Sequence, residues 1–163
     1  MAFRIGYGYD IHPFVSGRDL VLGGIPIPFD KGLDGDSDAD VITHAIIDAL
    51  LGAMGSGDIG RKFGIGKPEL IGISSLTLLD QVYQQMLEAK YRVVNLDITV
   101  VVESPKLSNY IPQMQMRLRS VLHLAELNDI NIKATTAKGI GPLGAGQAIA
   151  AYAVALLESN FNK

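Results

Sequence analysis

Hydrophobic and polar residues alternate with a period of two in several parts of this chain, and this alternation predicts β-strands. Residues 3–9 carry the pattern and predict the first strand. Residues 20–28, "LVLGGIPIP", predict a second extended segment, in which the paired glycines suggest a bulge. Further strands are predicted at 92–103 and 130–136. The chain therefore contains the material for a β-sheet.

Apolar residues at helical spacing predict helices between and after these strands. The first helix is expected to begin at Ser37 or Asp38 as the N-cap and to end at Gly55. After a glycine-rich loop at 55–73, further helices are predicted at 74–90, 108–125 and 147–159. The last of these, "QAIAAYAVALLES", is apolar nearly all round, which predicts a helix that is buried on more than one side, in part by a neighbouring chain.

The order of the predicted elements is β-β-α-α-β-α-β-α, without an internal repeat. Interleaved strands and helices predict an α+β fold, a two-layer sandwich in which helices cover one face of a mixed β-sheet. Length predicts a single domain over 1–163, and the contents of 48% hydrophobic and 19% charged residues are those of a globular protein. Because the apolar content is high for a small chain, some surface is expected to be buried between subunits.

Charge and cysteine content exclude several classes of partner and site. A formal charge of -3 gives no electrostatic reason to expect nucleic acid or an anionic membrane surface as a partner. The chain has no cysteine, so disulfides and thiolate metal sites are excluded. No run of about 18 apolar residues and no signal-peptide core are found. We expect a cytoplasmic protein, or one of the plastid stroma if a transit peptide has been removed.

Two histidines and an aspartate are candidates for a metal site. Asp10 and His12 are two residues apart in an extended segment, so both side chains point to the same side. His44 lies early in the first predicted helix, which a sheet-and-helix layer can bring close to the strand. Each has a simpler interpretation, a polar strand end for the pair and a buried core histidine for His44. Together they form a set of three nitrogen and oxygen ligands, which is typical of a catalytic zinc site with one open position.

Three loop segments carry groups that suit a phosphorylated ligand. "GSGDIG" at 55–60 offers Asp58 and the amides that follow it to a small polyol, or it is a simple glycine-rich turn. "ESPKLS" at 103–108 places Lys106 after a strand, and "KATTAKG" at 133–139 ends another strand with hydroxyls and lysines. Ammonium and hydroxyl groups bind phosphate oxygens, although a solvated strand end is the alternative for both segments.

Longer segments around these residues resemble one family from end to end. "RIGYGYDIHPF" is similar to its opening motif, and "SDADVITHAIIDALLGAMGSGDIG" is similar to its signature helix and loop. "SPKLSNYIPQM" and "INIKATTAKGIGPLGAGQAIAAYAVALL" are similar to its later segments. The chain resembles the 2-C-methyl-D-erythritol 2,4-cyclodiphosphate synthase family, the cyclising enzymes of the non-mevalonate isoprenoid (terpenoid) pathway.

The resemblance implies a metal-dependent phosphorus-oxygen lyase. Such an enzyme cyclises 4-diphosphocytidyl-2-C-methyl-D-erythritol 2-phosphate, a cytidine diphosphate derivative, to 2-C-methyl-D-erythritol 2,4-cyclodiphosphate and releases CMP. It also implies a homotrimer with sites between adjacent subunits, and a divalent metal, with zinc as the expected ion, on Asp10, His12 and His44. The implied catalytic residues are Thr136, Asp36 and Lys138. The implied substrate-binding residues are Asp10, His12, Asp36, Ser37, Asp58, Ile59, Gly60, Phe63, Pro105, Lys106, Leu107, Ala134, Thr135 and Thr136.

Four departures from the family pattern bear on activity. Asp36 stands where many members have histidine, residues 64–67 lack two loop acids, and Ala145 stands where an arginine is common. Lys138 replaces a glutamate that holds a second metal, magnesium or manganese, which argues against that second metal here. The alternatives to an active cyclase are a diverged, non-catalytic trimeric module that binds a metal or phosphorylated ligand, and a metal-dependent phosphohydrolase.

Overall fold

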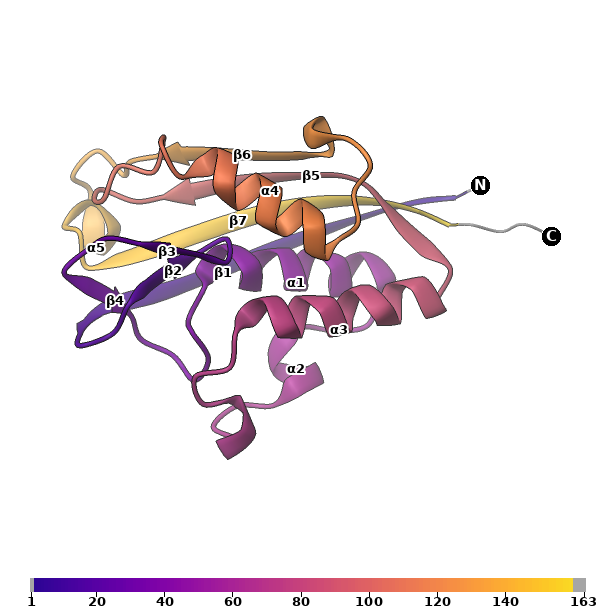
Figure 1. Ribbon diagram of the computed structural model, residues 1–163, viewed down its shortest axis with the longest axis horizontal. Helices are drawn as coiled ribbons and strands as arrows, with labels where there is room; N and C mark the ends of the chain where they lie inside the picture. The colour runs from indigo at the N-terminus through magenta and orange to yellow at the C-terminus, as the bar shows by residue number, and fades with distance from the viewer. Residues whose placement is uncertain (1, 160–163) are drawn as a thin grey trace.

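The computed structural model describes residues 2–159, without the side chain of Leu127, and its centre is a mixed five-stranded sheet (Figure 1). The strand order is β4-β1-β7-β5-β6. The β5–β6 pair is parallel, and the other neighbours are antiparallel. The strands span Phe3–Ser16 (β1), Lys31–Leu33 (β4), Tyr91–Val101 (β5), Ile130–Thr135 (β6) and Ala148–Ser159 (β7).

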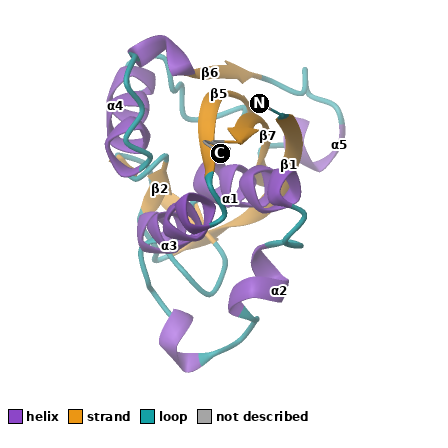
Figure 2. Cartoon of the chain, turned by 90° about the vertical axis from the view of Figure 1, so that its right-hand side faces the viewer, coloured by secondary structure: helices purple, strands orange, loops and turns teal. Residues whose placement is uncertain are grey.

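Three helices cover one face of this sheet, as predicted for a two-layer α+β sandwich (Figure 2). They are α1 (Val41–Met54), α3 (Ser75–Glu88) and α4 (Ile111–Val121). In the part of the chain that the structure describes, no helix has the length and hydropathy to cross a bilayer. Shorter elements are the hairpin β2 (Leu20–Leu22) and β3 (Ile25–Ile27), α2 (Ile59–Phe63), α5 (Gly141–Gly144), and 3₁₀ turns at Pro68–Leu70 and Leu127–Asp129. A single domain over 1–163 stays a prediction, because residue 1 and residues 160–163 lie outside the described residues.

Two glycines of β1 set the distance between the sheet and α1. A Cβ atom on Gly6 would lie 1.8 Å from the carbonyl oxygen of Ala49, and one on Gly8 would lie 1.9 Å from that of Ala45. Any side chain at these two positions would therefore overlap the helix backbone. The strand rests directly on α1, and His44, which precedes Ala45, is thereby brought to the strand residues beyond Gly8.

Replacing Gly8 with alanine is expected to separate α1 from β1. Overpacking a close contact destabilises a protein by about 1–3 kcal/mol, and a shift of α1 would also move His44. We expect a lower melting temperature and weaker zinc binding, measured by calorimetry and by competition with a chromophoric chelator. Gly52→Ala is the control, because a Cβ there meets only one atom, at 3.9 Å, and alanine favours a helix. Equal stability of the two variants would contradict the close-contact argument.

The predicted helix at 147–159 is wrong, because this segment forms the central strand β7. Its two edges pair with β1 and β5. One face, from Ile149 to Leu157 at alternate positions, joins the core under α1, and most of the other face is apolar as well. A strand that is covered in this way has no alternating polar residues, and its many alanines have high helix propensity. The paired edges and the core-facing side account for much of this apolar character within one chain, whereas Tyr152, Val154 and Leu156 on the opposite side stay partly exposed.

Smaller differences concern where elements begin and end. β1 continues to Ser16, so Asp10 and His12 lie inside the strand and not at its end. The N-cap of α1 is Asp40, whose carboxylate accepts from the backbone N–H of Thr43 at 3.1 Å. The same carboxylate accepts the N–H groups of the Gly23–Gly24 turn at 2.9 and 2.7 Å, so the paired glycines form a tight hairpin in place of a bulge. α4 is shorter than the predicted 108–125.

Candidate metal centre and active site

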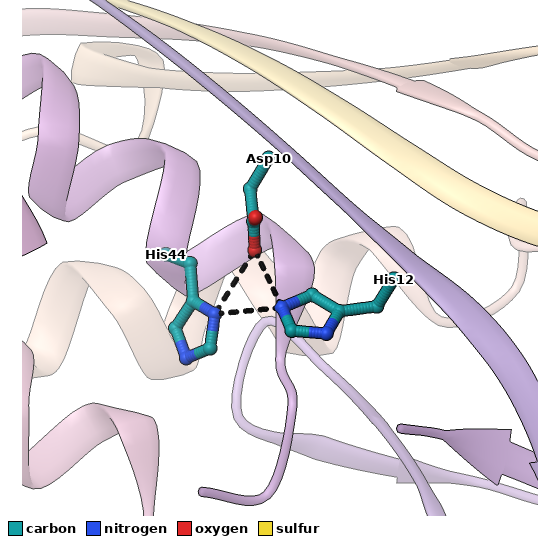
Figure 3. A group of neighbouring side chains, drawn as sticks. All are labelled: Asp10, His12 and His44. Carbon is teal, nitrogen blue, oxygen red and sulfur yellow. Dashed lines mark hydrogen bonds and ion pairs between the residues drawn. The ribbon is translucent and has the colours of Figure 1, made fainter. Parts of the chain in front are cut away.

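Asp10, His12 and His44 converge on one point, as predicted (Figure 3). Asp10 Oδ2 lies 2.9 Å from His12 Nε2 and 3.0 Å from His44 Nδ1, and the two nitrogens are 3.3 Å apart. Ligands at 2.0–2.2 Å from a tetrahedral zinc ion lie about 3.3–3.6 Å from one another. The three donors thus fit such an ion after outward shifts of a few tenths of an ångström, and they leave its fourth position to a substrate or water.

Each histidine has a hydrogen bond on the nitrogen that faces away from this point. His12 Nδ1 is bonded to the backbone carbonyl of Asp34, and His44 Nε2 lies near the hydroxyls of Ser75 and Ser37. A histidine that donates from one ring nitrogen has a free lone pair on the other. With a metal ion bound, each ring would therefore offer the lone pair of its inner nitrogen to the ion. Without an ion, the same inner nitrogens can donate to Asp10 when they carry a proton.

The electrostatics of the three residues also favour a bound cation. Burial alone would raise the pKa of the Asp10 carboxyl, but hydrogen bonds from His12 and His44 hold this pKa well below its usual range. Burial lowers the pKa of His12, whereas the Asp10 carboxylate raises it, and the net pKa is raised. Asp10 is thus ionised near neutral pH, and its negative charge favours a cation at this point.

A cavity of about 340 Å³ adjoins the three ligands. Asp58 caps α2 by accepting from the N–H of Arg61 at 2.8 Å, and Asp48 accepts from the N–H of Ile59 at 2.7 Å. These two carboxylates hold the start of α2 against the cavity. The predicted residues in its wall are Asp10, His12, Asp36, Ser37, His44, Ile59, Gly60 and Phe63, and the other lining residues are Gly35, Gly64, Ile65, Leu70 and Leu78. Asp58 is adjacent but does not line it.

Asp36 fixes the loop that closes one side of this cavity. Its carboxylate accepts from the backbone N–H of Gly66 at 2.6 Å, and its own carbonyl accepts from the N–H of Gly72 at 2.8 Å. The loop at 64–72 is thereby bonded near both of its ends to one residue. The structure gives the predicted catalytic residue Asp36 a contact with the backbone of this loop.

A second cavity, of about 290 Å³, holds the remaining predicted binding residues. Its predicted members are Pro105, Lys106, Leu107, Ala134, Thr135 and Thr136, and Val102, Glu103 and Ser108 complete the lining. Glu103 accepts from the N–H of Ala137 at 2.8 Å and joins the two loops. Lys138, with a left-handed φ of 57°, is exposed and lines neither cavity.

The two cavities share no lining residue, so the fold of one chain brings the predicted residues together as two separate groups. Figure 1 shows that β1, β5 and β6 all end at the same, left-hand end of the sheet. The register places Asp10 level with Val100 near the end of β5 and with Ala134 near the end of β6. The candidate metal ligands and the loops after β5 and β6 therefore belong to one end of the molecule.

Comparison with known proteins identifies the family. The sequence model of the YgbB family matches residues 3–158. The chain belongs to the YgbB family. Within it, the chain is 51% identical over 154 residues to the 2-C-methyl-D-erythritol 2,4-cyclodiphosphate synthase of Pelotomaculum thermopropionicum, with 94% of both chains covered.

Two solved structures with similar sequences have the same fold as this chain. IspF of Plasmodium falciparum, in its CDP complex, is 33% identical with a TM-score of 0.85, and 97% of each chain is covered. The bifunctional IspDF of Campylobacter jejuni is 35% identical with a TM-score of 0.93. The match covers 97% of this chain but 42% of that larger protein. The recognition of the family from sequence segments is therefore confirmed.

Several residues that no sequence pattern links to the site act on it through hydrogen bonds. Ser75 and Asp38 stand behind His44, Asp48 holds the start of α2, and Glu103 joins the two loops of the second cavity. The pattern does mark Asp38 as a candidate helix cap, because aspartate is common there, but it does not connect Asp38 or Ser75 with His44. The chemical roles of the individual site residues stay predictions.

Proposed function

We propose that the chain cyclises 4-diphosphocytidyl-2-C-methyl-D-erythritol 2-phosphate to 2-C-methyl-D-erythritol 2,4-cyclodiphosphate, with release of CMP. An oxygen of the 2-phosphate forms a bond to the β-phosphorus, and the bond from this phosphorus to the oxygen shared with the α-phosphate breaks. The observation that carries the proposal is the Asp10–His12–His44 cluster beside an open cavity, in a chain about half identical to named synthases over nearly their full length.

The chain's own residues bind and align the two ends of the substrate. Ile59 and Gly60, with Asp58 beside them, hold the erythritol part, and Lys106 with its neighbours in the second cavity holds the cytidine diphosphate part. The hydroxyl of Thr136 donates a hydrogen bond to the β-phosphate as negative charge develops there. A divalent ion on the three ligands, which we propose to be zinc, supplies Lewis-acid stabilisation of the approaching phosphates. A cytoplasmic location belongs to the same proposal.

The direct test is to incubate purified protein with the diphosphocytidyl substrate and zinc, and to follow phosphorus NMR. Equal amounts of CMP and of the cyclic diphosphate are expected. Release of inorganic phosphate would instead indicate a phosphohydrolase. Binding of the substrate without any new phosphorus signal would indicate a non-catalytic module, and either result would overturn the proposal.

We expect Asp36 to act by positioning the loop at 64–72. Asp36→Ala removes the acceptor of the Gly66 N–H, so the loop opens and KM should rise by about tenfold, the effect of losing one charge-assisted hydrogen bond. Asp36→Asn keeps a carbonyl acceptor and should resemble the wild type. Steady-state kinetics distinguish positioning of the loop, which affects KM, from a direct action of the carboxylate on the phosphates, which affects kcat. If the carboxylate acts on the phosphates directly, both variants will lose kcat to the same extent.

We propose a homotrimer that uses the sheet face opposite the helices. On β1, alternate side chains leave this face apolar, and they are 41–73% exposed in one chain. Single exposed apolar residues are common on protein surfaces, but a contiguous apolar face such as this one is typical of an interface. The face is therefore suited to burial by further copies of the chain. An assembly on this face would allow the second cavity of one subunit to face the metal ligands of its neighbour. The residues are Phe3, Ile5, Tyr7, Tyr9 and Ile11, with Val154 of β7 beside them.

Light scattering should give the mass of three chains, and Tyr7→Glu should shift it to the mass of one. A carboxylate cannot be buried in this face without a partner, which makes the assembled state unfavourable. Met116→Glu on α4 is the matched control, because Met116 and Tyr7 are both 61% exposed in one chain. A monomeric wild type at micromolar concentration, or an intact trimer of Tyr7→Glu, would contradict the assembly.

A further inference from the structure

The outer nitrogen of His44 is bonded to a buried serine from a distant part of the chain. Ser75 Oγ lies 2.9 Å from His44 Nε2, and Ser75 is fully buried at the start of α3. Ser75 Oγ also donates to a carboxylate oxygen of Asp38. His44, Ser75 and Asp38 thus form a chain of hydrogen bonds that runs from the candidate ligand to a carboxylate.

The hydrogen bonds of Ser75 decide which nitrogen of His44 carries the proton. The single hydroxyl proton of Ser75 is used toward Asp38, since a carboxylate only accepts. Toward His44, Ser75 Oγ can then only accept, so the bond between them requires His44 Nε2 to be the donor. In the neutral ring, His44 Nδ1 then carries the lone pair, 3.0 Å from Asp10 Oδ2, where the ion is expected.

Ser37 is also close to His44 but has no comparable support. Its hydroxyl is 3.1 Å from His44 Nε2 and 3.3 Å from Ser75 Oγ, and it accepts from the backbone N–H of Ala39 at 3.2 Å. No carboxylate lies behind it among the hydrogen bonds of the described residues. Ser75 is therefore the stronger acceptor for the His44 proton.

We propose that Ser75, supported by Asp38, is a positioning residue of the metal centre. It fixes the His44 ring with Nδ1 toward the ion and makes that nitrogen a better ligand, because the carboxylate draws on the Nε2 proton through the hydroxyl. His12 has only a backbone carbonyl, that of Asp34, in the same position. The proposal rests on the metal ion of the proposed function but concerns residues that contact neither the ion nor the substrate.

Hydrogen bonds donated by backbone N–H groups hold Ser75 in place independently of its hydroxyl. The N–H of Ser75 donates to Asp38 Oδ2 at 3.0 Å, and the N–H of Asp38 donates to the carbonyl of Ile73 at 3.0 Å. Ser75→Ala consequently removes the hydroxyl while the start of α3 stays bonded to Asp38. This makes the variant a selective probe of the bond to His44.

The test measures zinc affinity of the full-length protein by competition with a chromophoric chelator. Loss of an outer hydrogen-bond partner typically weakens metal binding by about 10–100-fold, and we expect this for Ser75→Ala and a smaller loss for Asp38→Asn, which keeps an acceptor. Ser74→Ala is the control, because Ser74 is exposed and makes no side-chain cap bond, and it should stay within about twofold of the wild type.

Nitrogen-15 NMR of the histidines in metal-free protein provides a readout that a merely structural role would not change. The wild type should show His44 protonated at Nε2, and Ser75→Ala should show a mixture of both tautomers. If Ser75→Ala keeps wild-type zinc affinity and tautomer while the wild type binds zinc and releases CMP, the positioning role alone is overturned. A wild type that binds no zinc overturns both this role and the metal in the proposed function.

Discussion

Replacing His44 with alanine should abolish zinc binding and lower turnover by about 10³-fold or more. His44 is one of the three candidate ligands, and it is buried, with 8% of its surface exposed. A metal that stabilises charge in the transition state supplies several kcal/mol, and each 1.4 kcal/mol corresponds to a factor of ten in rate. The sheet face that we propose for assembly does not include His44, so the trimer should persist.

Isothermal titration with zinc, CMP release and light scattering measure these three effects on one sample. His123→Ala is the matched control, because His123 is exposed and stacks on Tyr83, away from the ligands. It should bind zinc and turn over like the wild type. A His44→Ala protein that keeps one tightly bound zinc per chain would show that the ion is held elsewhere.

The candidate ligand set was predictable because its signals are local. Asp10 and His12 share a face of one strand by the period of two, and a polar residue on an otherwise apolar helix marks His44. Their meeting depends on Gly6 and Gly8, whose missing side chains allow contact between strand and helix. The sequence shows these glycines but not the helix carbonyls that they approach.

The strand β7 was mispredicted because periodicity loses its meaning at the centre of a sheet. Ala150, Ala151 and Ala153 are all fully buried, so neither face carries a polar pattern, and alanine favours a helix in isolation. Pairing with β1 and β5 decides the conformation, and both partners are distant in sequence. Tertiary context overrides local preference here.

The residues behind the ligands were missed for a related reason. Ser75 is 31 residues from His44, and no spacing rule connects a helix start to a histidine on another helix. The same holds for Glu103 and the N–H of Ala137, which are 34 residues apart. Motifs identify the groups that touch a ligand, whereas the groups that hold them are found only when the packing is known.

Lys138 is expected to replace the second metal ion that the family resemblance associates with a glutamate at this position. The cyclisation brings two phosphates together, and their repulsion requires a cation. Lys138 is exposed beyond β6, two residues after Thr136, and takes part in none of the ion pairs within residues 2–159. Its ammonium group is therefore free to meet a phosphate. At an effective dielectric constant of 20, opposite unit charges about 4 Å apart attract by roughly 4 kcal/mol, which surrounding solvent reduces.

Turnover should then depend on zinc but only weakly on added magnesium, and Lys138→Ala should lower kcat by about 10–100-fold. Lys138→Glu should regain activity only when magnesium is supplied, because the carboxylate restores an oxygen ligand for a hard cation. Lys133→Ala is the control, since Lys133 is paired with Asp97 on the sheet and should not affect kcat. Magnesium titrations of all four proteins give the answer. If the wild type needs millimolar magnesium, or Lys138→Ala turns over normally, the ammonium group does not replace the ion and Lys138 is a solvated loop residue.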